Sequence, residues 1–422
     1  MEILRGNAVV AQSGGPTAVV NASACGVIQE ASKYDAVRNL YGANNGILGI
    51  VQEDIFDLRA ESADTIEQLR CTPSSAIGSC RYNLGDLTAD RAKYDRLLEV
   101  FRAHDIRYFF YIGGNDSMGL AAKVNQLARA EGYELRVLGI PKAVDNDLIA
   151  TDHCPGYGSA AKYLAVSVME AGRDTEAMYT FDPVTITEAM GRNTGWIAAA
   201  TALARRREDE APHLIYVPEI PFSLERFLDD VRDVHRRLGR VFVVVSEGIV
   251  DAQGEYVATE ATTDAFGRRQ LGGVAAFLQQ QVMREIGIKC RYNKLDTCQR
   301  NAVHFASRTD SDEAYLCGQE AVRQALAGTS GFMVTLTRTN ERPYRCATGL
   351  APLEEVAGGV RRLPREYLDV AGTGISEALR TFAGPLIVGE VPLRLGIDGL
   401  PEFARLQRRP VAKKLPPFIG KT

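Results

Sequence analysis

The feature of this sequence that most constrains its fold is a repeated order of a short apolar run, a glycine-bearing turn and a helix-like segment. In the first half of the chain, the runs 7–12, 107–112 and 135–140 have the composition of buried strands. Helical periodicity follows the first two runs, to about residue 32 and over about 118–130. Strands that alternate with helices are joined by right-handed crossovers, which produces a parallel sheet covered on both faces. We therefore predict an α/β fold of doubly wound parallel sheets.

The second half of the chain repeats this order with different loops. Its strand-like and helix-like segments are 183–188, 195–206, 213–219, 223–238, 240–246, 272–286, 309–327 and 334–338. Because a chain of 422 residues is longer than a single hydrophobic core usually accommodates, we expect two domains. We predict one domain from residues 1–155 with about 299–350, and the other from 156–298 with about 351–422.

One loop carries a dense set of charged side chains after a predicted strand. Pro141 ends the run 135–140 because proline cannot donate to a sheet ladder, and Lys142, Asp145 and Asp147 follow it. Ligands of open parallel sheets bind outside the carboxyl ends of the strands. A carboxylate there can take a proton from a hydroxyl, and an ammonium can hold a phosphoryl oxygen. A polar connection with a local ion pair explains this loop alone equally well.

Three other loops place glycine at the start of a helix, at 13–15, 113–117 and 191–193. Backbone N–H groups and the helix dipole at such turns suit a phosphate. A single glycine-bearing turn is more often structural, but three of them together with the Lys142 loop predict a phosphate site. Neither a Walker A motif nor G-x-G-x-x-G occurs at these places, which argues against a P-loop enzyme and an ordinary dinucleotide-binding domain.

Composition excludes several other classes of protein. A formal charge of −4 and a pI near 5.9 provide no general field that attracts nucleic acid. No apolar run approaches the roughly 20 residues that span a bilayer, and the first residues lack a signal-peptide layout, so we expect a cytoplasmic protein without a membrane partner. The eight cysteines form no C-x-x-C pair and are expected to be reduced. The basic segment 405–421 is expected to be a docking or solvated tail.

Taken together, the loops resemble those of the phosphofructokinase family. The matching motifs are the loops 113–117 and 141–147, the turn 190–192 and the pair Gln299 and Arg300, in family order and at family spacing. The resemblance is greatest to bacterial pyrophosphate-dependent phosphofructokinases, which phosphorylate fructose 6-phosphate at its 1-hydroxyl. It implies two Rossmann-like domains with the active site in the cleft between them, Mg²⁺ as cofactor, pyrophosphate and fructose 6-phosphate as substrates, and a homodimer or homotetramer.

Asp116 and Lys142 carry the expected choice of phosphoryl donor, since ATP-using relatives usually have glycine at both positions. A carboxylate near the α-phosphate of ATP would repel it by up to about 4 kcal/mol for charges about 4 Å apart at an effective dielectric near 20. That energy corresponds to roughly two to three orders of magnitude in donor discrimination. Lys142 adds positive charge at the transferring group. We favour pyrophosphate; the alternatives are an ATP-dependent 6-phosphofructokinase and a pyrophosphate-dependent kinase of another sugar phosphate, such as sedoheptulose 7-phosphate.

The resemblance also implies a role for each matching residue. The catalytic group comprises the base Asp145 with Lys142, Asp116 and Arg192. The pyrophosphate-binding group comprises Gly14, Gly15, Arg81, Gly114, Asn115 and Ser117. The sugar-phosphate-binding group comprises Ala143, Val144, Asp145, Met190, Gly191, Arg192, Glu247, Arg291 and Arg300. Taken singly, Arg81, Arg291 and Arg300 would also fit surface ion pairs.

Two of the departures from the family pattern concern candidate site residues. Asn115 stands where many relatives have a magnesium-associated aspartate, and a neutral amide is a weaker ligand for a hard cation. Asn115 and Asp147 remain the candidate metal ligands. Ala143 replaces a threonine that contacts the reacting phosphate in relatives. Two other classes remain as alternatives: a non-catalytic sugar-phosphate sensor, which the complete loop 142–147 disfavours, and a nicotinamide-dependent dehydrogenase, which the missing G-x-G-x-x-G disfavours.

Overall fold

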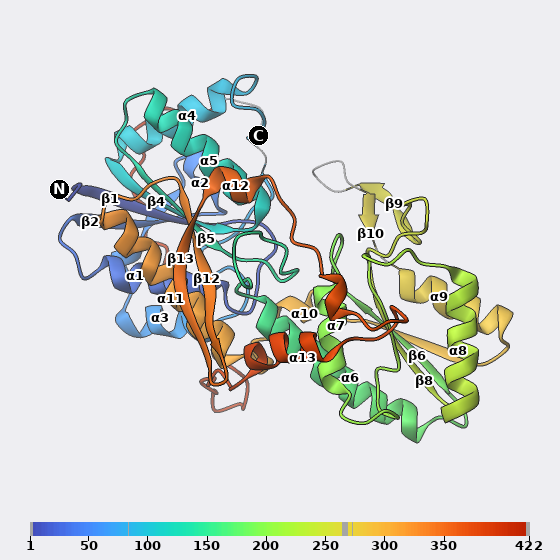
Figure 1. The fold of residues 1–422 in the computed structure, drawn as a ribbon. Helices are drawn as coiled ribbons and strands as arrows, with labels where there is room; N and C mark the ends of the chain where they lie inside the picture. Colours follow the sequence, from blue (N-terminus) through green and yellow to red (C-terminus); the bar gives the residue numbers. More distant parts are fainter. Residues whose placement is uncertain (1–2, 83, 264–268, 272, 419–422) are drawn as a thin grey trace.

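The computed structural model describes residues 3–82, 84–263, 269–271 and 273–418 of the chain. It contains two α/β bodies, each built on its own sheet (Figure 1). A seven-stranded sheet has the order β13-β12-β5-β4-β1-β2-β3, and a four-stranded sheet has the order β11-β6-β8-β7. The predicted fold class is confirmed. No helix within the described ranges is both long and apolar enough to cross a membrane.

The larger sheet is parallel except at its two edges, where β3 and β13 run antiparallel to their neighbours. Its strands are β1 (Gly6–Gln12), β2 (Val37–Ala43), β3 (Ile55–Asp57), β4 (Ile106–Gly113), β5 (Arg136–Pro141), β12 (Phe332–Glu341) and β13 (Tyr344–Pro352). One face is covered by α1 (Val20–Ala31), α3 (Ala63–Gln68) and α11 (Arg308–Leu326). The other is covered by α2 (Ile47–Val51), α4 (Arg91–Ala103), α5 (Asn115–Ala130) and α12 (Leu353–Ala357). Alternate residues of β1 enter the two cores, as a strand buried on both faces requires.

The smaller sheet is entirely parallel. Its strands are β6 (Val184–Ala189), β7 (Leu214–Tyr216), β8 (Val241–Ser246) and β11 (Cys290–Lys294). One face packs on α6 (Tyr157–Ala177), α7 (Trp196–Ala200) and α13 (Glu377–Ala383), and the other on α8 (Leu224–Leu238) and α9 (Val274–Glu285). The short helix α10 (Cys298–Asn301) follows β11, and β9 (Thr259–Thr263) pairs with β10 (Arg269–Leu271) as a small antiparallel ladder.

Most predicted elements are present, with differences at their ends. The predicted helix 223–238 is confirmed as α8: the Ser223 side chain accepts a hydrogen bond from Arg226 N, and Gly239 ends the helix in the left-handed region at φ 69°. The predicted helix 195–206 is shorter, since α7 is followed by a 3₁₀ turn at Thr201–Ala204. The predicted strand 213–219 reduces to β7.

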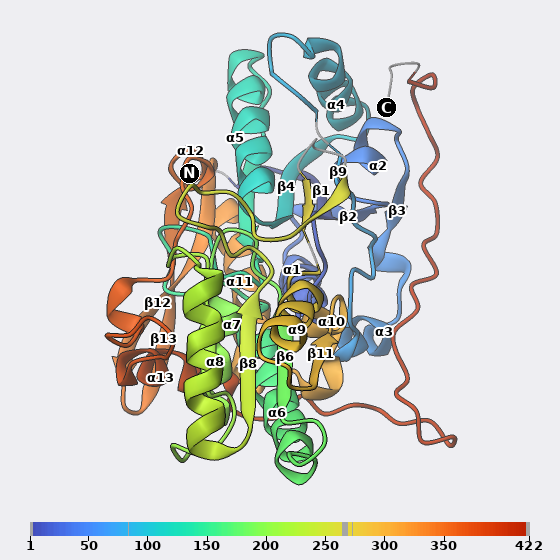
Figure 2. The ribbon, with the colours of Figure 1, turned by 90° about the vertical axis from the view of Figure 1, so that its right-hand side faces the viewer.

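The chain beyond β13 divides its contacts between the two bodies, and the domain boundaries remain a proposal. Leu353 and Val356 pack in the core of the larger sheet, whereas Leu379 and Phe382 pack against the smaller one. The tail then returns to the larger sheet, where it runs extended beside β3 (Figure 2). Val411 N donates to Ile55 O at 3.0 Å, so the described part of the predicted tail is docked. We therefore propose that only about 359–390 of the segment 351–422 belongs with the second domain.

Candidate active site

The site is built on three neighbouring parallel strands of the larger sheet. β5, β4 and β1 lie side by side, so the loops after them meet at one edge. Gly14 and Gly15 follow β1, Gly114 follows β4, and Lys142 follows β5. Lys142 N donates to Gly113 O at 3.0 Å, which joins two of these loops directly.

Three cationic side chains surround the turn after β1. Lys142 is buried, and its Nζ donates to Gly15 O at 2.6 Å. A Cβ on Gly15 would lie 2.6 Å from Arg300 Nη1 and 4.0 Å from Arg81 Nη2, so glycine is needed for this approach. Burial and the neighbouring Arg300 charge lower the pKa of Lys142 to about 8. Burial and the Arg81 charge likewise lower the pKa of Arg300. An anion with several charges would relieve the repulsion among these three cations. The turn therefore has the positive surroundings that a phosphate site requires.

The segment 72–81 is fixed to this turn by a buried polar network that the sequence reasoning missed. Gln12 Nε2 donates to Asn21 Oδ1 at 2.9 Å, and Asn21 Nδ2 donates to Thr72 O at 2.8 Å. Gly14 N donates to Cys80 O at 3.1 Å, next to Arg81. The available signal was a pair of amide side chains in otherwise apolar elements, since buried polar groups are normally hydrogen-bonded to one another.

The loop after β5 holds two carboxylates next to these cations. Oδ1 of Asp145 is buried and receives no hydrogen bond from any described residue. Burial, and then the charges of Asp147 and Glu247, raise the pKa of Asp145 to about 7. Asp147 Oδ2 accepts a hydrogen bond from Asn115 Nδ2 at 3.1 Å, yet burial still raises its pKa. A carboxyl with a pKa near neutrality suits general base catalysis.

The remaining predicted donor-side residues lie around the same loops. Asp116 is exposed in the first turn of α5, close enough for its charge to act on Asp147. Ser117 is buried, and a Cβ on Gly113 would lie 2.2 Å from its Oγ. A Cβ on Gly114 would lie 3.5 Å from Lys142 O. The structure therefore brings Asp116 and the residues predicted to bind pyrophosphate into one cluster.

The smaller sheet contributes the opposite wall. Gly191 follows β6 with φ +136°, and a Cβ there would lie 2.4 Å from Thr194 O, so only glycine fits. Gly191 N donates to Glu247 Oε1 at 3.3 Å, and Met190 N donates to Gln299 Oε1 at 2.9 Å. Burial raises the pKa of Glu247. The turn 190–192 and Glu247, which are both predicted to bind the sugar phosphate, are thus adjacent.

Direct contacts join the two bodies at the loop that carries Asp145. Thr194 Oγ1, which the sequence reasoning did not single out, donates to Asp145 O at 3.0 Å. Ala143 packs against the core of the larger sheet and Val144 against that of the smaller one. Arg192 lies close enough to Glu247 for its charge to offset part of the burial effect on that pKa. The loop 142–156, which carries Asp145, therefore lies between the two bodies.

Arg291 is not brought to this site within one chain. It lies on β11 opposite Thr185, near the amino end of β6, whereas Gly191 follows the carboxyl end. Its side chain is 47% exposed and pairs with Asp174 at 3.5 Å and with Asp182. Within the chain it forms ion pairs, as the alternative explanation expected, with the exposed Asp174 and the buried Asp182.

Asn115 and Asp147 together offer oxygen ligands for a cation. Oδ1 of Asn115 is buried and receives no hydrogen bond within the described chain, while Nδ2 of the same amide holds Asp147. A carboxylate and an amide oxygen fit Mg²⁺, which usually takes its other ligands from water and substrate phosphates. No group of three or more His, Cys, Asp or Glu in the described ranges forms a metal-binding set.

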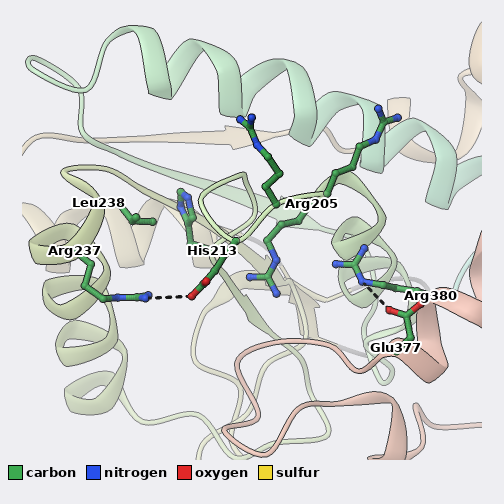
Figure 3. A pocket seen from close by; sticks show the side chains of 9 residues that line it. Arg205, His213, Arg237, Leu238, Glu377 and Arg380 are labelled. Atoms are coloured by element: carbon green, nitrogen blue, oxygen red, sulfur yellow. Dashed lines mark ion pairs between the residues drawn. The ribbon is translucent and has the colours of Figure 1, made fainter.

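A separate basic cavity of about 670 Å³ lies away from these loops. Its lining residues are Arg205, Arg206, Arg207, Glu208, His213, Arg237, Leu238, Glu377 and Arg380. Figure 3 shows Arg380 turned towards Glu377, with which it pairs at 3.9 Å. His213 directly precedes β7, so the cavity is at the amino end of the smaller sheet and does not belong to the candidate site.

Residues 7–325 match the family model described as phosphofructokinase. The chain is 50% identical over 417 residues to the pyrophosphate–fructose 6-phosphate 1-phosphotransferase of Xanthomonas campestris pv. campestris (strain B100), with 98% of this chain and 99% of that protein covered. It is 48% identical over 412 residues to the protein of the same name from Methylococcus capsulatus, with 97% and 98% covered. A solved pyrophosphate-dependent phosphofructokinase from Marinobacter aquaeolei has a TM-score of 0.90 at 45% identity, with 99% of this chain and 100% of that chain covered.

Proposed function

The chain belongs to the phosphofructokinase family, and we propose that it transfers a phosphoryl group reversibly from pyrophosphate to the 1-hydroxyl of fructose 6-phosphate. The products are fructose 1,6-bisphosphate and phosphate. The observation that carries this proposal is the position of a buried amine and two arginines around the Gly14–Gly15 turn, beside the raised-pKa carboxyl of Asp145. Such an arrangement places a polyanion next to a base, as phosphoryl transfer to a hydroxyl requires.

In this proposal Asp145 accepts the proton of the sugar hydroxyl. Its Oδ1, to which no described residue donates, leaves an acceptor for that hydroxyl. Lys142 and Arg300 stabilise the negative charge of the moving phosphoryl group, and transfer is in line. Arg192 holds the sugar phosphate with its planar fork, and Glu247 accepts hydrogen bonds from sugar hydroxyls.

We further propose Mg²⁺ as the cofactor, held by Asp147 and by the amide oxygen of Asn115. A bound Mg²⁺ would neutralise charge on the phosphate oxygens of the donor. The two residues already share a hydrogen bond, so the protein pre-orders its own ligands at this position.

Donor choice is the part of the proposal that initial rates test most directly. We expect turnover with pyrophosphate and little with ATP in the purified protein, measured as fructose 1,6-bisphosphate in a coupled assay. Replacing both Asp116 and Lys142 by Gly should raise the ATP rate relative to the pyrophosphate rate. Turnover with ATP alone would refute the proposed donor, and no bisphosphate from either donor would indicate a non-catalytic protein. Sedoheptulose 7-phosphate in place of fructose 6-phosphate tests the acceptor range.

We also propose a cytoplasmic homodimer or homotetramer. Because Arg291 lies at the amino end of β11, it could reach a sugar phosphate only in a second subunit. Phe181, which is 61% exposed, lies beside the Asp182 that pairs with Arg291, so apolar surface is present for such a contact. Light scattering after size exclusion measures the assembly. A monomer with full activity would remove Arg291 from the site.

A further inference from the structure

The segment 359–363 crosses between the two bodies and lies beyond residues 7–325, which match the family model. Arg361 is its central residue. Its backbone N–H donates to Asp147 O at 2.8 Å, and its guanidinium donates to Asp152 O. Both carbonyls belong to the loop that carries Asp145, so Arg361 holds this loop at two points.

Arg361 also contacts the smaller body. Trp196 Nε1 donates to Arg361 O at 3.1 Å, and the Arg361 guanidinium carbon lies 4.6 Å from the centre of the Trp196 ring. Trp196 is the first residue of α7, directly after the turn that begins with Gly191. A movement of this turn therefore has to move Arg361 or break these contacts.

A second residue of the segment strengthens the link. Leu363 N donates to Glu219 Oε1 at 2.9 Å, and the same oxygen accepts from Gly195 N at 3.0 Å. A single carboxylate therefore joins the segment 359–363 to the end of the acceptor-side turn. The loop that carries the base and the turn that holds the sugar phosphate are both fastened to this short stretch.

We propose that Arg361 is a positioning residue that sets the alignment of the Asp145 loop with the Gly191 turn. The inference rests on the proposed function, because the alignment matters only if a hydroxyl held by one wall attacks a donor held by the other. Arg361 itself contacts neither substrate in the proposed mechanism. Misplacement of reacting groups by about 1 Å can reduce a rate by about 10²-fold.

The test is Arg361→Met, which keeps a long side chain against Trp196 and removes the guanidinium. We expect kcat to fall about 10- to 100-fold while KM for pyrophosphate and for fructose 6-phosphate changes less than about threefold, because the residues that bind each substrate remain. Arg361→Lys keeps the charge and should recover part of kcat. It also serves as the second variant if Arg361→Met does not fold.

Arg107→Met is a matched control. Arg107 lies 4.6 Å from the ring centre of Tyr133 and donates to the carbonyl of Glu134, but it is at the opposite end of β4 from the site. Arg107→Met should lower the melting temperature about as much as Arg361→Met and leave kcat within about twofold of wild type. An equal loss of kcat in both variants would assign the Arg361 effect to stability and overturn the proposal.

Trp196 provides a readout that does not depend on turnover, because it is the only tryptophan of the chain. Arg361→Met should shift or brighten its emission, whereas Arg107→Met should leave it unchanged. Trp196→Phe keeps an aromatic ring at this position and removes the Nε1–H donor, so its effect on kcat should combine less than additively with that of Arg361→Met.

The outcomes separate this inference from the proposed function. If the wild-type protein transfers no phosphoryl group from pyrophosphate, the proposed function fails and the positioning role fails with it. If the wild type is active and Arg361→Met retains kcat within twofold, only the role of Arg361 is overturned. A rise of KM with unchanged kcat would also overturn it, since that pattern describes a binding residue.

Discussion

Asp145 and Lys142 lie in one loop and have pKa values displaced in opposite directions. Burial disfavours the charged form of each, so it raises the pKa of Asp145 to about 7 and lowers that of Lys142 to about 8. Like charges reinforce both shifts, from Asp147 and Glu247 on the acid and from Arg300 on the amine. Between about pH 7 and about pH 8, the Asp145 carboxyl is therefore ionised while the Lys142 amine is still charged.

This arrangement predicts a bell-shaped dependence of kcat/KM on pH. Activity should rise as Asp145 ionises near pH 7 and fall as Lys142 loses its proton near pH 8. Lys142→Arg keeps the charge at all these pH values, so it should remove the alkaline limb and leave the acid limb in place. Initial rates from pH 5.5 to 10 measure both limbs. An alkaline limb that persists in Lys142→Arg would assign it to another group.

Asp145→Asn should separate catalysis from stability. We expect kcat to fall about 10²- to 10⁴-fold because the base is lost. The folded pKa of Asp145 is above its unfolded value near 3.9, so this group lowers the stability of the fold progressively as pH rises from about 4 to about 7, and the loss is complete above pH 7. The variant should therefore melt at a higher temperature than wild type at pH 8, and the difference should shrink towards pH 4. Near-wild-type turnover would end the assignment of Asp145 as the base.

Among the helices, α6 shows most clearly what a local pattern misses. This 21-residue helix follows the base loop, and no helix was predicted over 157–177. Its amino end is held by Asp310 of α11, which accepts hydrogen bonds from Gly156 N at 2.8 Å and from Ser159 N at 2.9 Å. A cap supplied from a distant part of the chain leaves no signal next to the helix that it begins.

Asp310→Ala should destabilise the protein by about 2–3 kcal/mol, because it leaves two buried N–H groups without an acceptor. Asp312→Ala is the matched control on the same helix. Asp312 is 47% exposed and forms ion pairs with Arg70 and Arg308, so its loss should cost less than about 1 kcal/mol. Urea unfolding measures both variants. Equal effects would show that Asp310 does not act as the cap.

The two bodies are joined by an ionic network centred on the buried His153, near the end of the loop that carries Asp145. His153 lies between Asp152, at 2.8 Å from its Nδ1, and Glu313, at 2.6 Å from its Nε2. Arg338 Nη2 lies 3.2 Å from Asp152 Oδ1 and also donates to Phe382 O at 2.9 Å. The network therefore connects α11 and β12 of the larger sheet to α13 on the smaller one.

Stability should depend on the charge of His153. Burial opposes that charge, but the hydrogen bonds to Asp152 and Glu313 outweigh it and raise the pKa of His153 to about 9. Because the folded value is above the unfolded value near 6.5, the stabilisation is fully present below pH 6.5 and is lost as pH rises through 9. His153→Gln should therefore lower the melting temperature more at pH 6.5 than at pH 9.5. His235→Gln, on α8, is the control, and a pH-independent difference would contradict the role of the network.

The order of apolar runs and glycine turns in the sequence determined the fold class and the loops at β1, β4, β5 and β6, because strand burial and turn chemistry are local properties. The residues expected around Lys142 and Asp145 came from the resemblance to the phosphofructokinase family, because no local pattern identifies Arg81, Glu247 or Arg300 as site residues. The tertiary structure alone placed Arg300 over Gly15, turned Arg291 away from Gly191, and brought Arg361 and Thr194 against the base loop. These contacts join residues far apart in the chain, and only the packing of one body on the other brings them within bonding distance.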